Sequence, residues 1–218
     1  MVPWVGGVVL PESPLELLPQ RDPLPVLIGF DREEESSFVL LGMPDPYLHR
    51  HWVADTIALV GAQRAPTLQA LYGRDKYEDL VWSFITAATD AVRGCPTRRL
   101  AGIAPGPTWR WLYTHTMENG NHWAQFRAGH VLEEQFLWHD WFGSYEPTPA
   151  EEVLADQVTD YWTNFAKTGD PNGPGLPAWP RYEAYTEPSL VLDTEIDVIS
   201  RYHAEECAFL DTIPSPWQ

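Results

Sequence analysis

The stretch Val26-Leu27-Ile28-Gly29-Phe30-Asp31-Arg32-Glu33-Glu34-Glu35 decides the fold class. Its first half is a short apolar run that follows a proline and precedes charges, which predicts a buried strand. The carboxylates come at the carboxyl end of that strand, where open α/β sheets assemble their sites. These charged side chains cannot all face one pocket, so we expect most of them to be solvated at a loop tip. The stretch therefore predicts an α/β fold with a candidate functional carboxylate.

A histidine much later in the chain is the natural companion of such a carboxylate. His130 lies in Arg127-Ala128-Gly129-His130-Val131-Leu132-Glu133-Glu134-Gln135-Phe136-Leu137-Trp138. A histidine titrates near neutral pH and can act as a general base, although a lone histidine is more often structural. The order of a carboxylate after a strand and then a distant histidine fits α/β-hydrolases, whose chain order is Ser, Asp or Glu, then His.

Composition excludes several classes of partner. The 218 residues carry 14 basic and 31 acidic side chains, a net charge of −17, which argues against nucleic acid and anionic membrane surfaces. The 44% of hydrophobic residues and 11 tryptophans indicate a folded chain. No apolar run approaches about 20 residues, so we expect no transmembrane segment. Met1-Val2-Pro3-Trp4 lacks the features of a signal peptide.

Periodicity and caps predict the remaining elements. Residues 2–25 contain many prolines and are expected to be irregular, whereas 47–72 should be partly helical. A helix is expected over 77–93, ended by Gly94, and a second strand over 108–114. The clearest helix is 149–167, because Thr148-Pro149-Ala150-Glu151 forms a capping box with proline at the first position. A short strand at 189–193 and a helix over about 197–212 that carries Cys207 complete the prediction.

The run Tyr161-Trp162-Thr163-Asn164-Phe165-Ala166-Lys167-Thr168-Gly169-Asp170-Pro171-Asn172, followed by Trp179-Pro180-Arg181-Tyr182, strongly resembles the type B carboxylesterase and cholinesterase family. That family carries Trp-x-x-Phe-Ala-x-x-Gly-Asp-Pro-Asn and then Trp-Pro-x-Tyr. Other similar segments occur in the family's order: Pro3 to Pro11, Gly29 to Phe38, Thr89-Asp90 with Cys95-Pro96, His130 to Phe136, and Cys207 to Leu210. The resemblance covers essentially the whole chain, but only the C-terminal portion of a family member.

The resemblance implies roles for four residues. Glu34 is similar to the family's triad acid and His130 to its triad base, and Cys95 with Cys207 matches its disulfide. From the residues alone, two unrelated buried thiols are the commoner case. The implied fold is the C-terminal portion of an α/β-hydrolase, with residues 1–218 as a single partial domain. The implied activity is hydrolysis of a small-molecule carboxylic ester without a cofactor, and the disulfide weakly favours a secreted or periplasmic location.

The sequence also departs from the family. Gly6 stands in place of the usual Asp, Glu35 and Val131 in place of usual glycines, and Glu134-Gln135 is more polar than usual. No Gly-x-Ser-x-Gly occurs, and the family's glycine-rich oxyanion loop is absent as well. The chain is therefore expected to supply acid and base, with the N-terminal half of the same enzyme as a partner and little activity alone. The alternative is a non-catalytic relic or a cholinesterase-like binding or adhesion domain.

Four further expectations follow. Glu133 is an alternative partner for His130. The remaining histidines do not match a known zinc spacing, so no metal site is expected; they include His49, His51, His115 and His122. Tryptophans near His130 either line a substrate pocket or, as we favour, belong to the core: Trp123, Trp138 and Trp141. Without further strands the sheet should leave apolar surface uncovered, which predicts a partner-dependent or aggregation-prone chain.

Overall fold

A four-stranded mixed sheet forms the centre of the structure, a computed structural model that describes residues 5–42, 45–73, 75–77, 79–120 and 122–213. The strand order is β1-β2-β3-β4. The first three strands are parallel and the last is antiparallel to its neighbour: β1 (Val26–Asp31), β2 (Thr108–Tyr113), β3 (Pro188–Leu192) and β4 (Asp197–Ser200). The segment from Pro3 to Pro11 is described only from residue 5 onward. The side chains of His49 and His51 lie outside the described part of the structure.

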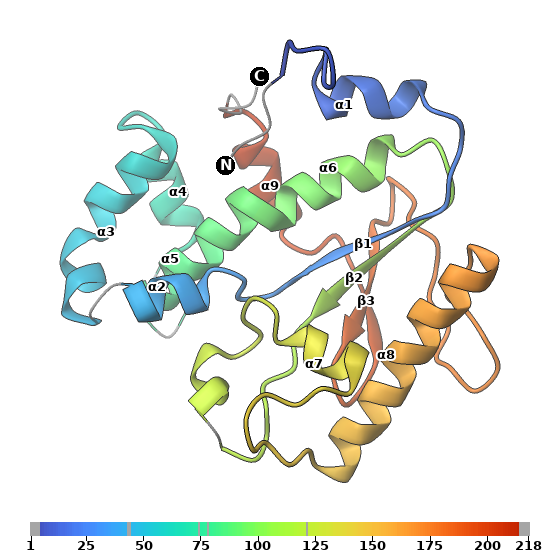
Figure 1. Cartoon of the computed structure of the whole chain (residues 1–218). Helices are drawn as coiled ribbons and strands as arrows, with labels where there is room; N and C mark the ends of the chain where they lie inside the picture. Colours follow the sequence, from blue (N-terminus) through green and yellow to red (C-terminus); the bar gives the residue numbers. More distant parts are fainter. Residues whose placement is uncertain (1–4, 43–44, 74, 78, 121, 214–218) are drawn as a thin grey trace.

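Helices cover both faces of the sheet (Figure 1). They are α1 (Pro14–Leu17), α2 (Ser36–Gly42), α3 (Asp45–Val60), α4 (Ala65–Leu71), α5 (Leu80–Thr89), α6 (Cys95–Ile103), α7 (Glu133–Trp138), α8 (Pro149–Thr168) and α9 (Ala204–Leu210), with short helical turns η1 (Leu18–Gln20), η2 (Asp90–Gly94) and η3 (His122–Phe126). Within the described part of the chain, no helix combines the length and apolar character needed to span a membrane.

The alternation of side chains along β2 explains the two layers. Trp109 and Tyr113 point to one face, where they form a core cluster with Leu154 and Val158 of α8. Helix α6 packs on the opposite face, against β1 and β2. The carboxyl ends of β1 and β2 therefore emerge beside α7 and α8, which places the residues after β1 near the His130 segment.

Helix α8 confirms the predicted element at 149–167, with one more residue. The Thr148 hydroxyl accepts a hydrogen bond from the Glu151 N–H, and the Glu151 carboxylate accepts one from the Thr148 N–H. Gly169 ends the helix in the left-handed conformation, with φ of 76°. The strands at 108–114 and 189–193 are confirmed as β2 and β3.

The prediction that Gly94 ends a helix was wrong. The chain continues from α5 through the π-helical turn η2 directly into α6, and Gly94 keeps helical dihedral angles, with φ of −59°. A Cβ on Gly94 would lie 3.1 Å from the Phe30 ring and closer still to the Asp90 carboxylate. The glycine therefore serves close packing of this helix on β1.

Two other segments differ from the prediction. Residues 197–212 were expected to be one helix but form β4, a turn and α9, because the apolar residues of 197–200 complete the sheet beside β3. Residues 2–25 were expected to be irregular, yet Ser13 caps the short helix α1 through a capping box with Glu16. Helices α6 and α7 had no clear sequence signal and were not predicted, while 47–72 divides into α3 and α4.

The Cys95–Cys207 disulfide is present, with the two Cα atoms 5.2 Å apart. It joins the first residue of α6 to α9 and lies inside a second hydrophobic cluster with Leu68, Tyr72 and Ala87. Both cysteines are buried. The bridge therefore ties the C-terminal helix to the helical layer that α3, α4 and α5 form.

Removing this bridge should destabilise the chain strongly. It closes a loop of 112 residues, and chain-entropy arguments assign about 4–5 kcal/mol to such a loop. We expect the Cys95→Ala/Cys207→Ala double variant to lose stability of that order in urea unfolding. Reduction of the wild-type protein should give the same shift and should leave the double variant unchanged. A shift below about 1 kcal/mol would contradict the expectation.

A buried histidine between two carboxylates joins three elements. His115, just after β2, contacts Asp193 through Nδ1 at 2.8 Å and Glu151 of α8 through Nε2 at 2.9 Å. Because both ring nitrogens face carboxylates, both must donate, and the ring is an imidazolium. Burial lowers the pKa of His115, but the hydrogen bonds to Asp193 and Glu151 outweigh this effect and raise the pKa above its usual value.

This network should make stability depend on pH in both directions. Because the pKa of His115 is raised in the folded state, its contribution is present below the unfolded pKa of about 6.5 and lost as the pH rises through the folded pKa. The pKa of Glu151 is lowered, so its contribution is lost as the pH falls. We expect His115→Gln to lose about 3 kcal/mol at pH 6, and less in alkali.

The matched control is His139→Asn, because His139 pairs with Asp156 at 3.7 Å on the exposed surface. Such exposed pairs contribute about 0–1 kcal/mol. Urea unfolding across pH 5 to pH 9 distinguishes the two variants. Equal losses for both, or a His115→Gln loss independent of pH, would contradict the role of the buried imidazolium.

Candidate active site

The Glu34 and His130 side chains meet at the carboxyl end of β1. Nδ1 of His130 lies 2.7 Å from Oε2 of Glu34. Glu34 is buried, whereas the His130 side chain is 39% exposed and its ring packs beside Phe38 with centroids 5.4 Å apart. A carboxylate on Nδ1 selects the tautomer whose Nε2 can accept a proton. The arrangement is thus suited to general base chemistry at Nε2.

The turn after β1 holds Glu34 in place. The Asp31 N–H donates to Oε1 of Glu34 at 3.0 Å, and the Glu34 N–H donates to the Asp31 carbonyl at 3.2 Å. The carboxylate therefore closes its own turn with one oxygen and faces His130 with the other. Such a doubly engaged side chain has little rotamer freedom, which favours a fixed orientation of the imidazole ring.

Hydrogen bonds tie this turn to the histidine segment. The Glu33 N–H donates to the Ala128 carbonyl at 2.8 Å, the Ala128 N–H donates to the Glu33 carboxylate at 3.2 Å, and the Ser36 hydroxyl donates to the Phe126 carbonyl at 2.7 Å. A Cβ on Gly129 would come within 2.5 Å of the Ser36 hydroxyl. The small residues before His130 are therefore required by this close approach. Glu33 and Ser36 were not predicted as site residues, because only the fold shows what they contact.

The departures from the family pattern leave this geometry intact. Glu35 follows Glu34, but its N–H donates to the Thr89 hydroxyl at 3.2 Å and its side chain is only partly buried. Gly6 has φ of 94°, and its N–H donates to the Leu10 carbonyl. Val131 has φ of 66°, a conformation that costs a β-branched residue energy. The one strained departure is therefore next to His130.

A group of buried carboxyls surrounds the pair. Burial, followed by the nearby Glu133 carboxylate, raises the pKa of Asp31 well above its usual value. Burial also raises the pKa of Glu33, although the nearby Arg32 acts to lower it. Burial likewise raises the pKa of Glu133, although its hydrogen bond with Asp31 acts to lower it. Glu133, the alternative partner expected for His130, lies against Asp31 instead, so Glu34 is the residue on Nδ1.

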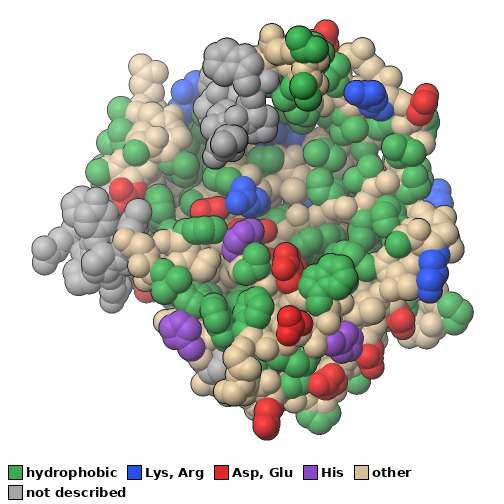
Figure 2. All heavy atoms as spheres, viewed as in Figure 1, with side chains coloured by type: hydrophobic (Ala, Val, Ile, Leu, Met, Phe, Trp, Pro, Cys, Tyr) green, Lys and Arg blue, Asp and Glu red, His purple; other side chains and the backbone are tan. Residues whose placement is uncertain are grey.

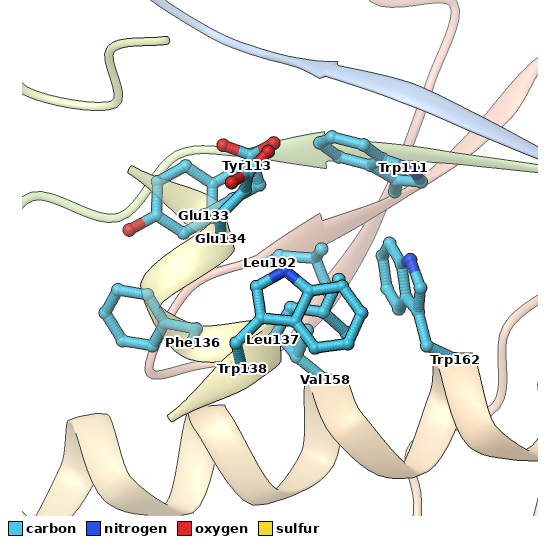
Figure 3. A pocket seen from close by; sticks show the side chains of 10 residues that line it. All are labelled: Trp111, Tyr113, Glu133, Glu134, Phe136, Leu137, Trp138, Val158, Trp162 and Leu192. Atoms are coloured by element: carbon cyan, nitrogen blue, oxygen red, sulfur yellow. The ribbon is translucent and has the colours of Figure 1, made fainter. Parts of the chain in front are cut away.

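A pocket of about 140 Å³ lies between α7, α8 and the sheet (Figure 3). Three indoles and two carboxylates stand out in its lining: Trp111, Trp138, Trp162, Glu133 and Glu134. On the molecular face in Figure 2, acidic side chains lie next to hydrophobic ones.

The tryptophans near His130 divide between pocket and core. Trp138 is 69% exposed and lines this pocket. Trp123 and Trp141 pack against the main core, as we expected for these tryptophans.

Gln135 is fully buried, and its side-chain carbonyl accepts the Phe142 N–H at 2.8 Å. Its polarity thus serves the loop after α7. Among the described residues, no group of three or more His, Cys, Asp or Glu side chains could hold a metal ion.

Comparison with known proteins identifies the family. The family model described as the carboxylesterase family matches residues 1–210. Carboxylesterase 5A of Canis lupus familiaris is 30% identical over 96% of this chain and 40% of its own length, and cocaine esterase of Oryctolagus cuniculus is 32% identical over 82% and 37%. The solved structure of PNB esterase superposes with a TM-score of 0.72 at 26% identity, over 92% of this chain and 41% of that one.

The chain thus spans about two fifths of the length of these relatives. Its sheet and its helices are those of an α/β-hydrolase portion. The resemblance found in the sequence is confirmed: this chain belongs to the carboxylesterase family.

Proposed function

We propose that this chain supplies the acid and the base for hydrolysis of small-molecule carboxylic esters. The observation that carries the proposal is the 2.7 Å contact between Nδ1 of His130 and Glu34. His130 takes the proton of a serine through Nε2 and then donates it to the leaving alcohol, while Glu34 stabilises the positive imidazolium. Water repeats the same proton transfers on the acyl-enzyme. The chain belongs to a family of esterases, which supports this assignment.

The nucleophile is proposed to come from the N-terminal half of the same enzyme. No Gly-x-Ser-x-Gly occurs in the 218 residues. Strand β1 pairs only with β2 in the described sheet, so its other edge is open. Val26, Leu27 and Ile28 on this edge strand are only partly buried although they are apolar. An open apolar strand favours pairing with further strands, which supports a partner at this edge.

Ester hydrolysis tests the proposal directly. We expect no turnover of p-nitrophenyl acetate by the chain alone, and turnover when it is mixed with a reconstructed N-terminal half. In the mixture, His130→Ala should lower kcat by about 10⁶-fold and Glu34→Gln by about 10⁴-fold, as for comparable triads. The control His139→Asn should leave kcat unchanged, since its ring pairs only with a surface carboxylate.

Each alternative has its own outcome. Turnover by the chain alone that depends on His130 would overturn the need for a partner. An inactive mixture, from halves shown by near-UV circular dichroism to be folded and by sedimentation to be associated, would favour the relic or binding domain. Activity of the mixture that His130→Ala leaves intact would overturn the assigned base.

Replacing the strained residue beside His130 should stabilise the chain. Val131 has φ of 66°, which glycine adopts without steric cost. We expect Val131→Gly to gain about 1 kcal/mol in urea unfolding, because the relieved strain exceeds the added chain entropy. The comparison variant Val153→Gly removes an exposed valine from the helical region of α8 and should lose stability of about 1 kcal/mol. Destabilisation by both would show that the Val131 conformation carries no strain.

A further inference from the structure

Outside the Glu34–His130 pair, the buried carboxyl of Asp31 contacts the partly buried carboxyl of Glu133. Asp31, at the carboxyl end of β1, is 1% exposed. No amide, hydroxyl or basic group among the described residues donates to either of its carboxylate oxygens, and the same holds for Oε2 of Glu133. The Asp31 and Glu133 side chains are in hydrogen-bond contact.

Two carboxyls in such contact repel when both are ionised, and Asp31 is removed from water, so a shared proton stabilises the pair. The neighbouring charges that raise the pKa of Asp31 come from Glu133 on α7 and from Glu33 and Glu34 in the turn after β1. The buried phenol of Tyr113 on β2 adds a neutral group beside them. Burial and Glu133 raise the pKa of Asp31, and the two carboxyls titrate as one coupled pair.

The pair spans the same two segments as the candidate acid and base. Asp31 precedes Glu34 by three residues, and its backbone N–H donates to the Glu34 carboxylate. Glu133 is the first residue of α7 and follows His130 by three residues. The contact between Asp31 and Glu133 therefore joins the same two segments as the contact between Glu34 and His130.

We propose that Asp31 and Glu133 are positioning residues that share one proton in a hydrogen bond, which holds the Glu34 turn against the His130 segment. Their role in catalysis rests on the function proposed above, whereas the shared proton does not. Loss of that proton as the pH rises leaves two facing carboxylates, whose repulsion separates the two segments. The pair thus sets an upper pH limit on the geometry of His130.

Asp31→Asn tests the shared proton through stability. The asparagine amide can donate to Glu133 as the acid does, but it has no proton to lose. A carboxyl whose pKa is raised by folding makes stability fall as the pH rises from about 4, where it ionises in the unfolded chain. In urea unfolding the midpoint of the variant should therefore gain on the wild type as the pH rises.

The control Asp160→Asn removes an exposed carboxylate from α8 and should follow the wild type at every pH. If the difference in urea midpoint between Asp31→Asn and the wild type stayed constant as the pH rises from about 4, the shared proton would be overturned. Should Asp31→Asn fail to fold, Glu133→Gln provides the second variant, because its amide can donate to an ionised Asp31 and the charge of Glu133 no longer raises the pKa of Asp31. Its urea midpoint should likewise gain on the wild type as the pH rises.

Spectroscopy tests the positioning role. The infrared difference spectrum between wild type and Asp31→Asn at pH 7 should contain a protonated carboxyl band, and the spectrum with Asp160→Asn should contain none. With ¹⁵N-labelled histidine, the pH dependence of the His130 nitrogen signals should differ between the wild type and Asp31→Asn. Absence of the acid band, or identical His130 signals in both proteins, would overturn the proposal.

The outcomes separate this proposal from the esterase function. An acid band together with an inactive mixture of halves would leave the shared proton standing and remove its catalytic meaning. An active mixture without the acid band would leave the function standing and overturn the pair.

Discussion

The crossing of the turn after β1 with the segment before His130 is the constraint on which the candidate site depends. These segments are far apart in sequence, yet two hydrogen bonds between Glu33 and Ala128 and one from Ser36 to Phe126 hold them together. Main-chain groups take part in all of these bonds, so the distance between Glu34 and His130 follows from the backbone. Gly129 is required at the crossing because a side chain there would meet Ser36.

The chain stabilises buried carboxylates in two different ways. Around His115, an imidazolium lies between Glu151 and Asp193, and the pKa of each carboxylate is lowered despite burial. Around Asp31 the neighbouring charges are carboxylates, and burial raises the pKa of Asp31 instead. An ion pair compensates the loss of hydration with opposite charge, whereas a shared proton removes one of the charges. Both arrangements lie at the carboxyl ends of the parallel strands.

The disulfide and the open edge of the sheet lie on two different sides of this portion of the fold. The bridge attaches α9 to a helical layer with its own hydrophobic cluster, separate from the core under α8. On the other side, β1 has the apolar composition of a central strand but occupies an edge. This mismatch between composition and position agrees with a chain that spans about two fifths of its relatives.

The sequence by itself determined the parallel strands, helix α8 and the family, because each depends on local signals: an apolar run, a capping box or a contiguous motif. Family resemblance also singled out Glu34, His130 and the two cysteines. Gly94 was misjudged because its role is to let Phe30 approach, a contact between distant segments. Only the tertiary structure placed Glu133 against Asp31 and Ser36 against Phe126. Those partners could not be predicted, since a side chain's environment depends on how separate segments cross in space, and one sequence carries no record of that.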